Sequence, residues 1–180
     1  AAGTRWSCVR DNNTGLVWEM KTEANAGIHA TNAKVKWVDR NVLAETSNAD
    51  ALCGIQTWRV PTVVELATIV NANRINPALD TNRFPNGAGS HWASVPVAGD
   101  AANGWVVNFF AGIPILKAKS GPMAQRLVSG EYQANDTSDD RYTVIDGTVT
   151  DGVTGLMWKQ CPEGLEGSDC SIGAAGLLIW

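Results

Sequence analysis

A repeated segment of eleven residues constrains this chain more than any other feature. VRDNNTGLVWE (9–19) aligns with VTDGVTGLMWK (149–159) at a constant offset of 140 residues, with six identities in eleven. In both copies Asp and Gly bracket a tight turn, and Leu and Trp then alternate on one face, as in a half-buried strand. The chain therefore contains the same opening segment twice.

The two copies are followed by very different lengths of chain. After the first, more than ninety residues continue through further predicted elements, whereas the second copy stops soon after it starts. An acidic, polar stretch, EYQANDTSDD, separates the two parts. The sequence therefore predicts a complete domain over 1–130, a linker over 131–140 and a partial second repeat over 141–180, which forms a β-strand extension.

Two helices are predicted in the first domain. In PTVVELATIVNAN, Thr62 is an N-cap and Glu65 completes a capping box ahead of an apolar face. The segment KWVDRNVLAETSNADALCG predicts a helix from about Trp37, with a break near Ser47. Short strands follow in HWASVPV, GWVVNFFAG, IPILKAK and AQRLVSG. This order predicts an α+β domain with an antiparallel sheet, whose two ends pair with each other.

Four cysteines allow three disulfide pairings. Cys161–Cys170 is favoured because it closes the short loop CPEGLEGSDC, together with Cys8–Cys53. This pairing predicts an oxidising, exported location, and four reduced thiols in a cytosolic protein are the alternative. The absence of any CxxC pair makes a zinc site improbable.

Five segments, in this order, resemble the Lcl C-terminal domain family: VRDNNTGLVWE, TWRVPTVVELATIV, HWASVPV, GWVVNFFAG and QRLVSG. The resemblance covers nearly all of residues 5–130, and 141–160 resembles the opening of another copy. The family is named after the C-terminal domain of a Legionella collagen-like surface adhesin. The resemblance implies a C-type-lectin-like fold with two helices and a twisted antiparallel sheet, in the branch that includes formylglycine-generating enzymes.

The same resemblance implies a secreted or cell-surface bacterial module for recognition and adhesion, which binds glycans or a host or matrix surface. In such a fold, ligands are met in the loops between strands, here about 82–92 and 111–123. An overall charge of −4 weighs against a polyanion site, although local basic residues are present. The candidate ligand contacts are His91, Trp92, Lys117, Lys119 and Arg126.

Trp58 and Arg59 stand directly before the capping box, where an indole and a guanidinium suit a sugar platform. Architecture is the favoured interpretation, because capping already accounts for Thr62 and Glu65 without a ligand. Arg59 is then expected to be buried against a carboxylate or backbone carbonyls. The proposed structural residues are Trp18, Trp58, Arg59, Thr62, Glu65 and Trp158.

The sequence indicates neither an enzyme nor a cofactor. It contains no GxSxG, P-loop, HExxH or GxGxxG motif, and its four cysteines pair off evenly. RDNNTG offers oxygen ligands for Ca²⁺, but an Asx-turn at Asp11 is favoured over a metal site. No apolar run approaches the roughly 20 residues of a membrane helix, and the charge does not favour nucleic acid.

A structural role is the alternative function. The strand of the second copy presents Leu156 and Trp158, which cannot be buried alone. It either docks on its own domain or is donated to a neighbouring copy, which would make the chain a subunit of a homo-oligomer or a pilus-like filament.

Overall fold

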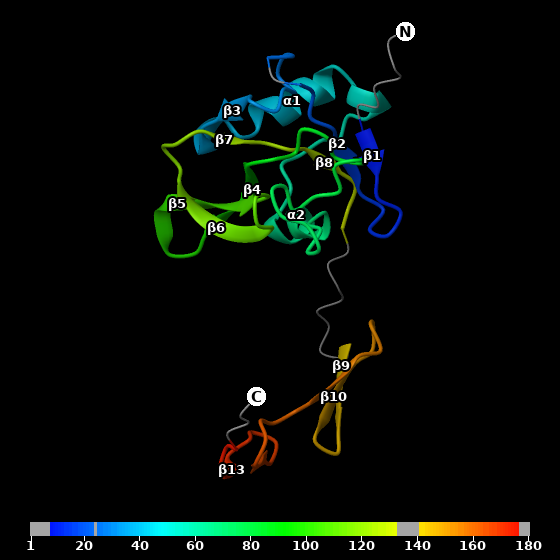
Figure 1. The fold of residues 1–180 in the computed structure, drawn as a ribbon, viewed down its shortest axis with the longest axis vertical. Coiled ribbons are helices and arrows are strands. Elements are labelled where there is room, and N and C mark those ends of the chain that lie inside the picture. Colours follow the sequence, from blue (N-terminus) through cyan, green and yellow to red (C-terminus); the bar gives the residue numbers. More distant parts are fainter. Residues whose placement is uncertain (1–7, 24, 133–140, 177–180) are drawn as a thin grey trace. The chain divides into compact units, whose positions relative to one another are not determined.

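A computed structural model describes residues 8–23, 25–132 and 141–176. The chain divides into two compact units, unit 1 (1–132) and unit 2 (133–180), which are described separately. Of the linker predicted over 131–140, residues 133–140 lie outside the described residues. Unit 1 is α+β, with two short α-helices and antiparallel sheets (Figure 1).

The two ends of unit 1 pair in a small antiparallel sheet, as the sequence predicts. Its strands are β1 (Cys8–Arg10), β2 (Val17–Glu19) and β8 (Val128–Ser129), in that order. Trp18 lies opposite Val9 on one side and Val128 on the other. The connecting turn needs Gly15, whose φ of 76° is rarely adopted by residues with a side chain. In unit 1 the TGL motif is therefore a turn leading into a buried strand.

A larger, five-stranded sheet has the order β3-β7-β4-β5-β6, with β3 and β6 at opposite edges (Figure 1). All its pairings are antiparallel except the short parallel contact of β4 with β7. The five strands are β3 (Lys34–Val35), β4 (Ser90–Val97), β5 (Asp100–Asn108), β6 (Ile113–Ala118) and β7 (Met123–Ala124). The predicted strands HWASVPV and IPILKAK lie in β4 and β6, and GWVVNFFAG is a strand only as far as Asn108, in β5. The predicted strand AQRLVSG is divided between β7 of this sheet and β8 of the small sheet.

Two α-helices are present in unit 1, but their limits differ from the prediction. The helix expected from Trp37 begins as a 3-10 turn, and the following α-helix runs through Ser47 without a break. The Ser47 hydroxyl donates to the Leu43 carbonyl at 2.7 Å, so this polar side chain is satisfied inside the helix. The helical elements are η1 (Trp37–Asp39), α1 (Val42–Ala49), η2 (Leu52–Gly54) and α2 (Val63–Thr68).

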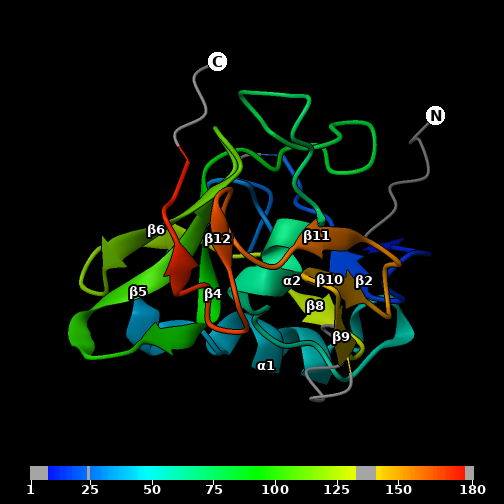
Figure 2. The same cartoon turned by 90° about the horizontal axis from the view of Figure 1, so that it is seen from below.

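Both faces of the large sheet are covered, which explains why consecutive residues of its central strands are buried. On one face, α2 packs against β4 and β5 (Figure 2), and Leu66 joins Trp18 and Phe109 in the main core cluster. On the other face, Trp37 contacts Trp92 edge to face, with ring centroids 5.2 Å apart. Gly104 lies against both indoles, and no side chain fits there, because a Cβ would come within 2.6 Å of the Trp37 ring and 3.1 Å of the Trp92 ring.

Unit 2 is a small β structure. Its first sheet has the order β11-β10-β9, from β9 (Tyr142–Ile145), β10 (Thr148–Asp151) and β11 (Met157–Lys159). A second hairpin joins β12 (Leu165–Glu166) to β13 (Ile172–Gly173).

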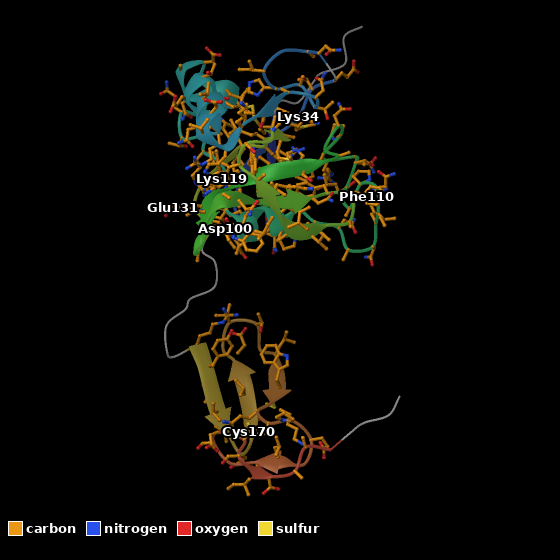
Figure 3. The ribbon with its side chains drawn as sticks, turned by 90° about the vertical axis from the view of Figure 1, so that its left-hand side faces the viewer. Lys34, Asp100, Phe110, Lys119, Glu131 and Cys170 are labelled. Carbon is orange, nitrogen blue, oxygen red and sulfur yellow. A yellow bond between two sulfur atoms is a disulfide. The ribbon has the colours of Figure 1, made fainter. Side chains whose placement is uncertain are left out.

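Both predicted disulfides are confirmed. Cys8–Cys53 ties β1 of unit 1 to η2, and Cys161–Cys170 closes a loop inside unit 2, where Cys170 is labelled in Figure 3. None of the helices in the described part of the chain is long and apolar enough to cross a membrane.

Candidate functional site

The motif around Trp58 and Arg59 is an architectural device. Thr62 Oγ1 accepts from the Glu65 backbone N–H at 3.2 Å, and Glu65 Oε2 accepts from the Thr62 backbone N–H at 2.8 Å, which confirms the capping box. Arg59 donates to both oxygens of Glu65 and to the Gly130 carbonyl. The predicted carboxylate partner is thus confirmed, although the Arg59 side chain is 39% exposed rather than buried.

Trp58 and Glu65 are both buried in this motif. The Trp58 indole N–H donates to the Leu52 carbonyl at 3.0 Å, and Trp58 packs against Leu127. Burial alone would raise the pKa of Glu65, but the hydrogen bonds from Arg59 and Thr62 outweigh it and lower the pKa. The carboxylate is consequently ionised, and both of its oxygens are bonded to groups of the fold.

A buried polar cluster organises the interior behind β2. Glu19 Oε1 accepts from Lys21 Nζ at 2.8 Å and contacts His29 Nδ1 at 2.7 Å, while Glu19 Oε2 accepts from the Leu127 backbone N–H at 2.8 Å. Burial would raise the pKa of Glu19, but its bonds to His29 and Lys21 lower it overall. A single carboxylate therefore holds together groups from β2, the following loop and the end of unit 1.

Arg126 is a further charged member of this cluster. Its Nη1 donates to the Glu19 backbone carbonyl at 2.5 Å, and its guanidinium lies over the Phe84 ring at 5.2 Å. The Nε and Nη2 atoms have no hydrogen-bond partner among the described residues. Burial, only partly offset by Glu19, lowers the pKa of Arg126 to about 10, so the group stays charged near neutrality.

Three of the five predicted ligand contacts lie in the interior instead. His91, Trp92 and Arg126 are all buried, with exposed fractions of 1%, 0% and 0%. The predicted loop placement is wrong for His91 and Trp92, because β4 begins at Ser90 and both residues belong to it. Both faces of β4 are covered, so these side chains contact Phe109 and Trp37 and are out of reach of an external ligand.

The two remaining predicted contacts are lysines near the β5–β6 hairpin. Lys117 is exposed on β6. Lys119 donates from Nζ to the Ala101 carbonyl at 3.0 Å and lies 5.3 Å from the Trp37 ring centroid. Figure 3 shows Lys119 near Asp100, on the opposite side of unit 1 from Phe110. Since Arg126 is buried, it adds no charge to a basic surface patch with these lysines.

A polar groove of about 530 Å³ lies elsewhere on unit 1. It is formed where the β1–β2 turn meets two neighbouring segments from much later in the chain, the end of α2 and the turn that begins at Asp80. Its lining residues are Val9, Arg10, Asp11, Asn12, Thr68, Ile69, Val70, Asn71, Ala72, Asn73, Asp80, Arg83 and Phe84.

The polar side chains of the groove differ in how far the fold already uses them. Asp11 accepts from the Asn13 backbone N–H at 2.9 Å and from the Thr14 hydroxyl at 2.7 Å, which confirms the predicted Asx-turn. Asp80 likewise accepts from the Asn82 backbone N–H at 3.0 Å. In contrast, Arg10 and Arg83 are exposed, and neither guanidinium forms an ion pair with a described side chain. The groove therefore presents free hydrogen-bond donors beside carboxylates that are already engaged.

Sequence reasoning did not identify this groove. From the sequence, the turn at Asp11 offers oxygen ligands for Ca²⁺, and no site residue is predicted at the end of α2. Among the described residues, no group of three or more His, Cys, Asp or Glu side chains could hold a metal ion. The sequence does show two Asn-containing turns, one at Asn12 and one at Asn71 to Asn73. That these turns lie close together depends on how the β1–β2 hairpin packs against α2.

Taken together, the chain carries a disulfide-bonded α+β domain whose termini pair in one sheet and which has a polar groove on its surface. A family model described as the Lcl C-terminal domain matches residues 7–129. The chain therefore belongs to this adhesin-like family. No curated protein matches the sequence.

Proposed function

We propose that this chain is a non-catalytic recognition and adhesion module of an exported or cell-surface protein, and that it binds carbohydrate in the groove between β1 and the end of α2. The observation that carries the proposal is the composition of the groove. Arg10 and Arg83 offer donors that form no ion pair with a described side chain, and Asn71 and Asn73 offer amides, in a groove that Ile69 and Val70 also line. Sugar hydroxyls need such convergent donors and acceptors next to apolar surface.

The charge balance favours a neutral or weakly acidic sugar over a long sulfated chain. Two guanidinium groups lie beside two carboxylates in the groove, and the whole chain carries a net charge of −4. A polyanion requires a continuous basic surface, which this groove lacks. A glycan with one carboxylate could bind an arginine and still leave its hydroxyls to the asparagines.

The fold supports the same proposal in two further respects. We propose that unit 1 is C-type-lectin-like, since its terminal strands close one sheet and a second sheet follows two helices. The two disulfides of the chain, one in each unit, suit the oxidising environment of an exported protein, and none of the four cysteines is free to act as a nucleophile.

A glycan array with the purified native chain and three variants tests this proposal. Arg83→Ala and Asn73→Ala are expected to weaken binding of retained glycans by about tenfold each, because each removes one hydrogen-bonding group worth ~1.4 kcal/mol. Lys117→Ala is the matched control, since Lys117 is exposed on β6 and does not line the groove. No retention of the native chain on any glycan, or equal loss with the Lys117 variant, would contradict the groove as the site.

A further inference from the structure

The two copies of the repeat fold into equivalent hairpins. β1 pairs with β2 so that Val9 is opposite Trp18, and β10 pairs with β11 so that Val149 is opposite Trp158. Asp151 accepts from the Val153 backbone N–H and from the Thr154 hydroxyl, which repeats the turn at Asp11. Residues 140 positions apart in the sequence therefore occupy equivalent positions in the two hairpins.

The two hairpins differ in how far their apolar side chains are buried. Leu16 and Trp18 are 0% exposed, whereas Leu156 and Trp158 are 57% and 48% exposed. In unit 1 the apolar face of the hairpin is covered by α2, β5 and β8, which contribute the buried residues Leu66, Val107 and Val128. We call this covering part of unit 1, residues 20–132, the body.

The free edge of the second hairpin also has a counterpart in unit 1. β2 lies between β1 and β8, but β11 pairs only with β10 among the described strands. The open side of β11 thus corresponds to the side of β2 that β8 occupies. A strand such as β8 and an apolar helix such as α2 would complete this hairpin, as they do in unit 1.

The charge at the position of Glu19 indicates which kind of body the second hairpin can dock on. The buried Glu19 corresponds to Lys159, and the buried Lys21 corresponds to Cys161. If the second hairpin docked on the body of this chain, the ammonium of Lys159 would replace the carboxylate of Glu19. It would then meet Arg126, which bonds to the Glu19 backbone, at a position with no compensating anion. Burying like charges together in this way is strongly unfavourable.

We propose that the β10–β11 hairpin docks on a domain body of the same kind that carries an acidic or uncharged side chain in place of Arg126, and that Lys159 prevents it from docking on the body of this chain. The partner is thus defined by an apolar cleft for Leu156 and Trp158, a β8-like strand for the edge of β11, and a negative or neutral interior. Lys159 is meanwhile paired with Glu163 at 2.6 Å, with both side chains more than half exposed. This interaction does not depend on the sugar-binding proposal.

Reversing the charge at residue 159 tests the proposal with the full chain. Cys8→Ser, always made together with Cys53→Ser so that no free thiol is left, releases the first hairpin from its disulfide, so that a competing hairpin can replace it during refolding. Cys8→Ser with Lys159→Glu is expected to form dimers by hairpin exchange after unfolding and refolding. Cys8→Ser alone is expected to remain monomeric, and adding Trp158→Ser to the charge variant is expected to restore the monomer. Sedimentation velocity at micromolar concentration measures all three.

Two outcomes would overturn the inference. If the charge variant sediments as a monomer like Cys8→Ser, the hairpin does not recognise a body of this kind. If Cys8→Ser itself dimerises through Trp158, Lys159 does not prevent the second hairpin from docking on the body of this chain. A second comparison keeps the test valid should Cys8→Ser fail to fold: with the disulfide intact, Glu19→Lys is expected to have a lower Tm than Glu19→Gln. Equal Tm values for these two variants would show that the body tolerates a lysine there.

Discussion

At the scale of single residues, the interior of unit 1 depends on one carboxylate among several basic groups. Glu19 faces Lys21 and His29, and the cationic Arg126 is bonded to its backbone. Removing one member of such a buried set typically costs about 3–5 kcal/mol, because the remaining charge stays uncompensated. The balance of charge in this cluster therefore makes stability sensitive to protonation.

The pKa of His91 predicts acid sensitivity. Burial, together with Arg126 and Lys21, holds the pKa of His91 well below its usual 6.5, so the folded state keeps this ring neutral. The unfolded chain takes up a proton near pH 6.5 while the folded chain does not, so stability falls as the pH drops below about 6.5. The Glu19 carboxylate, whose pKa is lowered in the folded state, adds a further loss at more acidic pH.

We therefore predict that His91→Gln flattens the dependence of stability on pH between about 5 and 6.5. The native chain is expected to lose ~1.4 kcal/mol per pH unit at full slope in this range, and the variant is expected to lose that contribution. Urea unfolding followed by tryptophan fluorescence at several pH values measures both slopes. An unchanged slope in the variant would show that another group takes up the proton.

At the scale of elements, the short helix α2 packs against the large sheet and contributes Leu66 to the main core cluster. It has only the six residues Val63–Thr68, so little of its stability comes from its own hydrogen bonds. Its start is held by the capping box and by the link from Arg59 to Glu65, and Arg59 also reaches Gly130 beside β8. The cap therefore couples the helix to the sheet formed by the two ends of unit 1.

Thr62→Ala is expected to destabilise unit 1 by about 1 kcal/mol, because the Glu65 backbone N–H loses its acceptor at the helix start. Thr46→Ala is the matched control, since the exposed hydroxyl of Thr46 bonds only within α1 and its loss should change stability by less than about 0.5 kcal/mol. Chemical denaturation measures both values. Equal effects at the two threonines would argue against a special role of the cap.

At the scale of the whole molecule, each compact unit contains one disulfide. Cys8 and Cys53 are 45 residues apart in the sequence, and their bond holds the first hairpin on the body. Cys161 and Cys170 are 9 residues apart and enclose a loop that lies wholly within unit 2. The two bonds should therefore act on different unfolding transitions.

Replacing both Cys8 and Cys53 by Ser is expected to lower the stability of unit 1 by about 4 kcal/mol, from the loop-closure entropy of the unfolded chain. Replacing Cys161 and Cys170 by Ser is expected to leave the transition of unit 1 unchanged. Thermal unfolding followed by the fluorescence of the buried tryptophans reports on unit 1. A lower transition in the second variant would contradict the separation of the two units.

The features that could be predicted from the sequence are those carried by residues close together along the chain. The capping box spans Thr62 to Glu65, the Asx-turn spans Asp11 to Asn13, and the Cys161–Cys170 loop is equally local. The strand segments after Ser90 were also recognisable, because alternation and bounding glycines are local patterns. The pairing of the two ends was predicted from the order of these elements.

What only the tertiary structure decided was which polar and aromatic side chains lie inside. His91 and Trp92 follow a Gly-rich loop and resemble surface contacts, but both faces of β4 are covered by segments that come from elsewhere in the chain. Arg126 is buried through a bond to Glu19, 107 residues away in the sequence. The groove likewise brings the β1–β2 turn against residues 68–84, nearly sixty residues later in the chain. The sequence by itself determined the repeat, the caps and the turns, because these arise from neighbouring residues, whereas burial and the groove depend on long-range packing.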